Sequence, residues 1–268
     1  MNKKSILIPV MVLVITLFTG CKEDSPVTVS RFRDILGFGG DNNEEIVALF
    51  RVCSWHRWHS NIVDSPEGFG PPYVLSNNYC WAYISDGNGR FVDPVSITCN
   101  GNSMQKLEIG QYEYRSNIGH LTNIDWYVEN ILGHTYQISD QNLPKIDFLN
   151  INNDDTLDIS NGLHINYSGY LGGDSEILLT IQYSYYVGFS NELRLYRFDK
   201  FFPNNGNIIL TLADLESFPL STIDASYLAT GYIELRQNKY EEEEFNGKFI
   251  GKIYETSMLT WITFDRER

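Results

Sequence analysis

The sequence predicts an all-β protein built from antiparallel strands, and three observations carry that prediction. Aromatic residues make up 14% of the 268 residues, including 17 Tyr and 15 Phe, and aromatic side chains favour strands. Apolar and polar residues alternate along short segments, and no segment sustains the apolar period of a helix. Turn residues separate these segments at short intervals, as in β-sandwiches. We therefore expect immunoglobulin-like β-sandwiches.

The strands of the first half follow from local patterns. Residues 45–53 are apolar enough for a strand that is buried on both faces. Pro and Gly residues then predict a long loop at 60–72, before a strand at 78–85. The Asp-Gly-Asn-Gly turn at 86–89 leads into a return strand at 92–99, because Gly and Asn tolerate positive φ. The other strands of this half are expected at 105–114, 124–130 and 134–138.

The second half starts after a polar break at 150–162, where we place a domain boundary. Residues 176–185 show the clearest strand pattern, because apolar and aromatic side chains occupy every second position. This predicted inner face comprises Ile177, Leu179, Ile181, Tyr183 and Tyr185. Asp214 and Glu216 favour a helical turn at 213–218, since acidic residues stabilise the first turn of a helix. Further strands are expected at 163–167, 192–198, 208–212, 227–236, 249–254 and 258–264, with an Asn246-Gly247 turn before 249–254.

Two antiparallel β-sandwich domains are therefore expected, one at 45–149 and one at 150–268. A single continuous β-domain is the alternative.

The N-terminus has the pattern of a secretory signal helix at residues 1–20. Lys3 and Lys4 precede an apolar run at 6–18, and small residues follow it. The run is shorter than the roughly 20 apolar residues of a membrane span. The Phe-Thr-Gly-Cys sequence ending at Cys21 resembles the lipobox of bacterial lipoproteins, although Phe18 stands where Leu is usual. The resemblance implies that Cys21 is acylated and becomes the first mature residue. An ordinary cleaved signal or an uncleaved anchor is the alternative.

Residues 21–44 are then expected to form a lipidated tether. Within it, Lys22-Glu23-Asp24 resembles the export signal of Bacteroidetes-type surface lipoproteins. This resemblance implies an outer-membrane protein that is exposed on the cell surface, with a periplasm-facing location as the alternative. The net charge of −14 argues against a nucleic-acid partner and against docking on anionic lipid headgroups. The membrane is therefore expected to be contacted through the lipid on Cys21.

Three further cysteines lie in the first half of the body. An oxidising compartment would allow one disulfide among Cys53, Cys80 and Cys99. Cys80 and Cys99 flank the predicted hairpin, which favours them as the pair. Sequence alone does not choose the pair, because the Cα separation decides it. Three buried thiols are the alternative.

Aromatic and histidine residues after the first strand are the leading candidates for a site. Trp55, Trp58 and Trp81 are candidates for a surface that stacks on a sugar, or for core packing. Cys53, His56 and His59 have a spacing that suits zinc on a helix. On the predicted strand, His56 and His59 point to opposite faces, so no metal site is expected.

Residues 150–161 resemble a dockerin or EF-hand calcium loop, with oxygen ligands from Asn150, Asn152, Asp154 and Asp158. Asp155 stands where the loop needs Gly, and Asn161 replaces the last acidic ligand. An interdomain linker is therefore the preferred interpretation.

No sequence motif indicates an enzyme. The chain has no Gly-x-Ser-x-Gly elbow and no phosphate-binding glycine loop, so no cofactor is expected. The body resembles uncharacterised β-sandwich lipoproteins of the Bacteroidetes type, which implies a lipid-anchored envelope protein with a non-enzymatic binding or structural role. A protein or a glycan is the expected partner. The alternatives are a carbohydrate-binding accessory lipoprotein and a cell-envelope hydrolase, since catalytic carboxylates are recognised by their separation in space.

Overall fold

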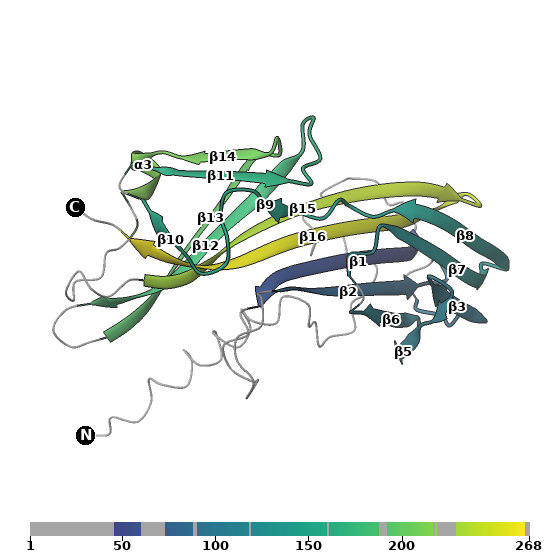
Figure 1. Ribbon diagram of the computed structural model, residues 1–268. Helices are drawn as coiled ribbons and strands as arrows, with labels where there is room; N and C mark the ends of the chain where they lie inside the picture. Colours follow the sequence, from purple (N-terminus) through teal and green to yellow (C-terminus); the bar gives the residue numbers. More distant parts are fainter. Residues whose placement is uncertain are drawn as a thin grey trace, which may run out of the picture. The chain divides into compact units, whose positions relative to one another are not determined.

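A computed structural model describes residues 46–59, 73–87, 90–117, 119–159, 161–187, 192–216, 218 and 229–265. The described part is all-β, with one short helix (Figure 1). The predicted signal at 1–20, the tether at 21–44 and the loop at 60–72 lie outside the described residues.

A mixed nine-stranded sheet is the centre of the fold. Its strands follow the order β13, β12, β15, β16, β1, β2, β6 and β5, and β10 also pairs with β16. The first strand and the last strand, β1 and β16, are parallel neighbours, and β10 is also parallel to β16. The members of this sheet are β1 (Ile46–His59), β2 (Tyr73–Ile84), β5 (Gln105–Glu108), β6 (Gln111–Ser116), β10 (Asp155–Asp158), β12 (Glu176–Val187), β13 (Glu192–Pro203), β15 (Ala229–Phe245) and β16 (Lys248–Asp265).

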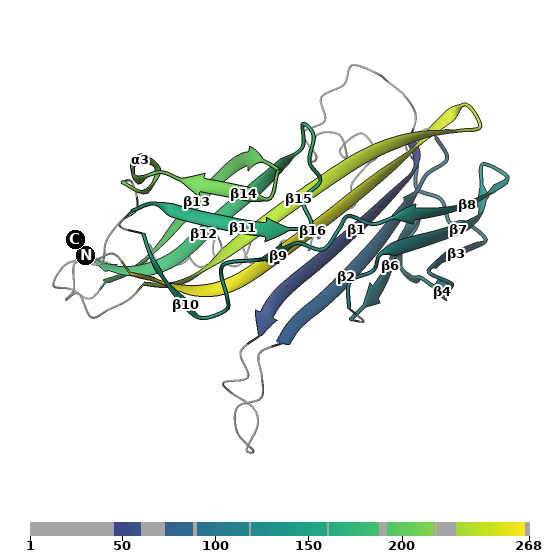
Figure 2. The same ribbon diagram turned by 45° about the horizontal axis from the view of Figure 1, so that its top comes forward.

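Two smaller sheets pack against one face of the large sheet (Figures 1 and 2). The four-stranded sheet has the order β4 (Asn102–Ser103), β3 (Ser96–Cys99), β7 (Asn123–Ile131) and β8 (His134–Gln141). The three-stranded sheet has the order β14 (Asn207–Leu210), β11 (Leu163–Ser168) and β9 (Asp147–Phe148). The helix α3 (Leu212–Leu215) follows β14.

Each small sheet encloses a hydrophobic core. In the first core, the ring of Phe50 lies 4.6 Å from that of Trp126 and 5.5 Å from that of Tyr136. In the second core, Leu179 and Ile181 of β12 are fully buried against the three-stranded sheet. Each core includes residues from both halves of the chain: Ile250 and Tyr254 of β16 lie in the first core, and Ile146 lies in the second. The large sheet joins strands from both sides of residue 150. The division into two domains at that residue stays a prediction.

Local patterns predicted several elements well. The five alternate residues of β12 face the core, with Ile177 completely buried. The helical turn is confirmed as α3, where Thr211 and Asp214 form a capping box. Asn246 and Gly247 both have positive φ between β15 and β16, as their turn requires.

One predicted hairpin is wrong. The segment at 92–99 does not return along β2, because β3 pairs with β7 and β4 in the four-stranded sheet. Among the described residues here, one isolated bridge, between Ser85 and Phe91, joins the end of β2 to the start of this segment. The chain thus crosses from one sheet to the other after this bridge.

Candidate functional site

A buried polar group separates the two cores on the covered face of β1 and β2. The inward residues of β1 change from Phe50 and Val52 to Ser54 and His56, and all four are buried. Opposite them on β2, Ser54 pairs with Asn78 and His56 pairs with Ser76. We call this group, with two residues from the adjoining loops, the polar seam: Ser54, His56, Ser76, Asn78, His120 and Asn142.

The serine and amide side chains of the polar seam are joined by hydrogen bonds. Ser54 Oγ donates to Asn78 Oδ1 at 2.8 Å, and Asn142 Nδ2 donates to Ser54 Oγ at 2.9 Å. Asn78 Nδ2 donates to the backbone oxygens of Gly119, at 2.7 Å, and Ser116, at 3.2 Å. These bonds fasten the loop after β6 and the segment after β8 to the large sheet. Buried polar groups need such partners, because an unpaired one costs free energy.

Two histidines form the other half of the polar seam. His56 Nδ1 lies 2.8 Å from Ser76 Oγ, and His56 Nε2 lies 3.1 Å from His120 Nδ1. A bond between two ring nitrogens requires one of them to carry the hydrogen and the other to accept it. Burial, together with the neighbouring His120 and Lys145, lowers the pKa of His56 to about 3. Burial is also the main reason why the pKa of His120 is lowered.

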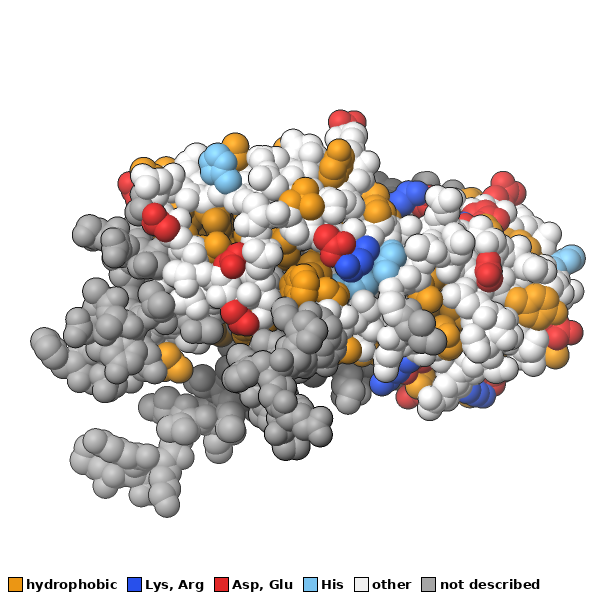
Figure 3. Space-filling view, in the orientation of Figure 1, with side chains coloured by type: hydrophobic (Ala, Val, Ile, Leu, Met, Phe, Trp, Pro, Cys, Tyr) orange, Lys and Arg blue, Asp and Glu red, His pale blue; other side chains and the backbone are white. Residues whose placement is uncertain are grey.

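Charged residues lie where the polar seam approaches the surface. Lys145 Nζ lies 2.5 Å from Asp147 Oδ1, and both groups influence the pKa of His120. Side chains of these three kinds adjoin near the middle of the face seen in Figure 3. Burial is the main cause that disfavours a positive charge on either histidine. The Lys145 ammonium adds to this effect, whereas the Asp147 carboxylate opposes it at His120.

The polar seam joins a serine to a histidine, yet its chemistry is unsuited to nucleophilic catalysis. A general base works best when its pKa lies near the working pH, whereas the pKa of His56 is about 3. The second ring nitrogen of His56 contacts His120, and a carboxylate takes this place in a Ser-His-Asp triad. Ser76 is itself buried. The geometry instead suits a structural bond between the sheet and two loops.

The three tryptophans proposed as a ligand surface do not share one face. Trp58 packs against the second core, on the covered face of the large sheet. Trp81 lies on the opposite face, where its strand neighbour is Arg51. Trp55 also lies on this opposite face, since it is an odd-numbered residue of β1 like Arg51. The guanidinium of Arg57 covers the ring of Trp55 at 5.2 Å.

On the opposite face, Trp81 belongs to a row of stacked groups that we call the arginine–aromatic ladder: Arg115, Tyr79, Trp81 and Arg51. The rings of Tyr79 and Trp81 are 5.4 Å apart and only 7° from parallel. Arg115 lies over Tyr79 at 5.4 Å, and Arg51 lies over Trp81 at 5.5 Å. A sugar stacks on the flat face of a ring, and here these faces are occupied by neighbours within the ladder.

Ion pairs continue the arginine–aromatic ladder across the sheet. Glu255 of β16 lies 3.4 Å from Arg51 and 3.7 Å from Arg236 of β15. Arg236 in turn pairs with Glu234 at 3.0 Å. Although burial lowers the pKa of Arg236, the two glutamates raise it above its usual value. This network balances positive and negative charges within the face.

The candidate calcium ligands are engaged elsewhere. Asn150 hydrogen-bonds the backbone of His164 and Asn166. Asn152 Nδ2 donates to Asp155 Oδ2 at 3.3 Å, and Asp154 Oδ2 accepts from Asn153 Nδ2 at 2.6 Å. Asp158 ends β10, which pairs with β16. Among the described residues, no three His, Cys, Asp or Glu side chains are grouped as metal ligands.

Sequence reasoning missed His120, Ser76 and Asn78 as parts of one site. The change from apolar to polar residues on the inner face of β1 was the available signal. A scan against protein-family models finds no match, and a search of curated proteins finds no significant relative. In the part of the chain that the structure describes, no helix has the length and apolar character of a membrane span.

Proposed function

We propose that this protein is a lipoprotein of a bacterial outer membrane, anchored by acylated Cys21 and exposed on the cell surface. Its body serves a non-enzymatic binding or structural role and consists of two immunoglobulin-like β-sandwich modules. The observation that carries this proposal is the Phe-Thr-Gly-Cys sequence at the end of the apolar run at 6–18.

Three features of the body support a non-enzymatic role. Ser76 of the polar seam contacts His56, whose pKa of about 3 is too low for a general base near neutral pH. Each arginine of the arginine–aromatic ladder pairs with a glutamate, Arg51 with Glu255 at 3.4 Å and Arg115 with Glu113 at 2.9 Å. Two small sheets cover one face of a long sheet, each over its own core, which suits a rigid displayed module.

Replacement of Cys21 tests the anchor. The Cys21→Ala variant should leave the membrane fraction and should no longer incorporate a labelled fatty acid, because the acidic body has little attraction for anionic lipid. Cys53→Ala is the matched control, since Cys53 lies within β1 of the folded body. Unchanged fractionation and labelling of the Cys21→Ala variant would contradict the lipid anchor.

The cell-surface location is tested separately. Replacement of Lys22, Glu23 and Asp24 by Ala should protect the protein from protease added to intact cells, while the protein stays in the membrane fraction. Equal cleavage of the variant and the native chain would show that these residues do not direct surface exposure.

A further inference from the structure

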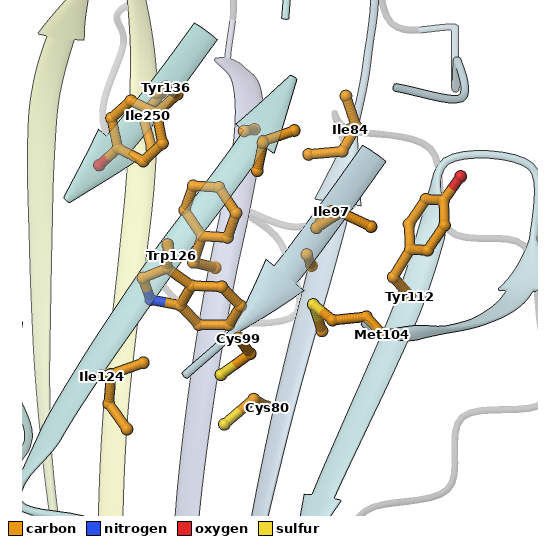
Figure 4. Close-up of a cluster of buried hydrophobic side chains, with 14 of the residues drawn as sticks. Cys80, Ile84, Ile97, Cys99, Met104, Tyr112, Ile124, Trp126, Tyr136 and Ile250 are labelled. Carbon is orange, nitrogen blue, oxygen red and sulfur yellow. The ribbon is translucent and has the colours of Figure 1, made fainter. Parts of the chain in front are cut away.

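Two cysteines from different sheets meet in the first core. Cys80 lies on the inward face of β2, in the large sheet, and Cys99 ends β3, in the four-stranded sheet. Both side chains are completely buried. Figure 4 shows them next to one another, and both are free thiols in this structure. Cys80 and Cys99 are thus neighbours, although not through the predicted hairpin: they meet because their two sheets pack against each other.

The third cysteine is placed differently. Cys53 lies on the opposite face of β1, where its thiol is 3.8 Å from Glu255 Oε1. Its cross-strand partner is Tyr79, whereas Cys80 pairs with the inward residue Val52. A disulfide requires Cβ atoms that point toward each other, so the sheet itself separates Cys53 from Cys80. Among the described cysteines, only Cys80 and Cys99 are positioned to bond.

We propose that Cys80 and Cys99 form a disulfide bond that joins the large sheet to the four-stranded sheet. This inference rests on the proposed export of the protein to an oxidising compartment. The two thiols lose two protons and two electrons as the S–S bond forms. The oxidant is the disulfide of a protein thiol–disulfide oxidoreductase, which is reduced to two thiols.

The bond has to form before the first core closes. The thiolate is the species that attacks a disulfide, and the pKa of the Cys80 thiol is raised by its interaction with Cys99 and by burial. In the folded state the Cys80 thiol is therefore held protonated, and the burial of both cysteines keeps them from an oxidoreductase. Once formed, the bond is protected from reductants by the same burial.

Peptide mapping tests the bond, because trypsin places the three cysteines on separate peptides. Cleavage after Arg51, Arg57, Arg90 and Lys106 gives the fragments 52–57, 58–90 and 91–106. The full chain is recovered from the membrane fraction, denatured without reductant and treated with iodoacetamide before digestion. Mass spectrometry should find 58–90 linked to 91–106, two hydrogens lighter than their sum, and 52–57 alkylated.

Thermal unfolding gives a second readout. A reductant present during the heating scan reaches the bond once the first core opens. It should therefore lower the Tm of the native chain by about 6–12 °C, as expected for the loss of a disulfide that closes a loop of this size. Cys53→Ser should keep both the linked peptides and the reductant effect, whereas Cys80→Ser should lose both. The reductant effect on the native chain does not depend on whether the Cys80→Ser variant folds.

The failures of the two proposals are distinguishable. If membrane-fraction protein yields 58–90 and 91–106 separately alkylated, the disulfide is refuted and the lipoprotein proposal stands. If the native chain remains in the cytoplasm, the export proposal is refuted. The purified chain is then refolded in a glutathione redox buffer, where the same linked peptides support the disulfide geometry and their absence refutes it.

Discussion

Replacement of His56 by Gln should make the protein less sensitive to acid. His56 is completely buried, and its pKa is about 3, compared with 6.5 for an exposed histidine. The folded state therefore binds a proton at His56 more weakly than the unfolded state does. The stability that depends on neutral His56 is present above the unfolded pKa of 6.5 and is lost progressively as the pH falls toward 3. Glutamine keeps a polar side chain and cannot take up this proton.

The size of this effect follows from the two pKa values. Between about pH 7 and about pH 5, protonation of the unfolded chain at His56 should cost about 2 kcal/mol of folding free energy. Acidic groups elsewhere also titrate, so the informative quantity is the difference between the native chain and the His56→Gln variant. The stability advantage of the native chain over the His56→Gln variant should shrink by about 2 kcal/mol as the pH falls from about 7 to about 5.

Urea unfolding followed by tryptophan fluorescence at several pH values measures this difference. His164→Gln is the matched control, since His164 is an exposed histidine on β11, and its difference from the native chain should stay constant. A difference for His56→Gln that does not change with pH would refute the view that burial in the polar seam keeps His56 neutral.

Three further substitutions test the packing of the body, each by urea unfolding. Gly169→Ala should cost at least about 2 kcal/mol more unfolding free energy than the control Gly172→Ala. Both glycines have positive φ, but only at Gly169 would a Cβ overlap a neighbouring atom, the backbone oxygen of Lys145. Equal losses of stability in the two variants would contradict this reasoning. Lys252→Met should cost about 3–5 kcal/mol of unfolding free energy, because the carboxylates of Asp140 and Glu243 lose their ammonium partner. A neutral effect would show that these two ion pairs contribute no net stability. Phe50→Ala should cost about 3–5 kcal/mol by opening a cavity beside Trp126, and a loss below about 1 kcal/mol would indicate a loosely packed core.

Local structure was predictable where a residue's neighbours along the chain decide it. The inward face of β12 follows from alternation, because successive strand residues point to opposite sides. The helical turn found as α3 and the turn at Asn246 likewise depend on a few adjacent residues. The end of β15 shows the limit: the strand was expected at 227–236, yet it continues through the acidic run at 241–244 and pairs with β16 as far as Phe245.

The candidate site was much less predictable. His56 and His120 are 64 residues apart, and their contact depends on how the loop after β6 returns over the large sheet. The faces of Trp55 and Trp58 follow from their alternation on β1, but only the folded sheet showed which face is covered. Cys99 was expected near Cys80 because of a predicted hairpin. That hairpin is wrong, since β3, which ends at Cys99, pairs with β7 in the other sheet.

The sequence by itself determined that this protein is β-rich, where many of its strands and turns lie, and which side chains of a strand share a face. These properties depend on backbone alternation and on residues close along the chain. Only the tertiary structure decided that β16 lies between β15 and β1, parallel to β1, so that both halves share one sheet. It also decided that polar residues of β1 and β2 meet His120 between two apolar cores. The reason is physical: strand pairing across the whole chain is selected by the total burial of all faces together, and no short segment contains that information.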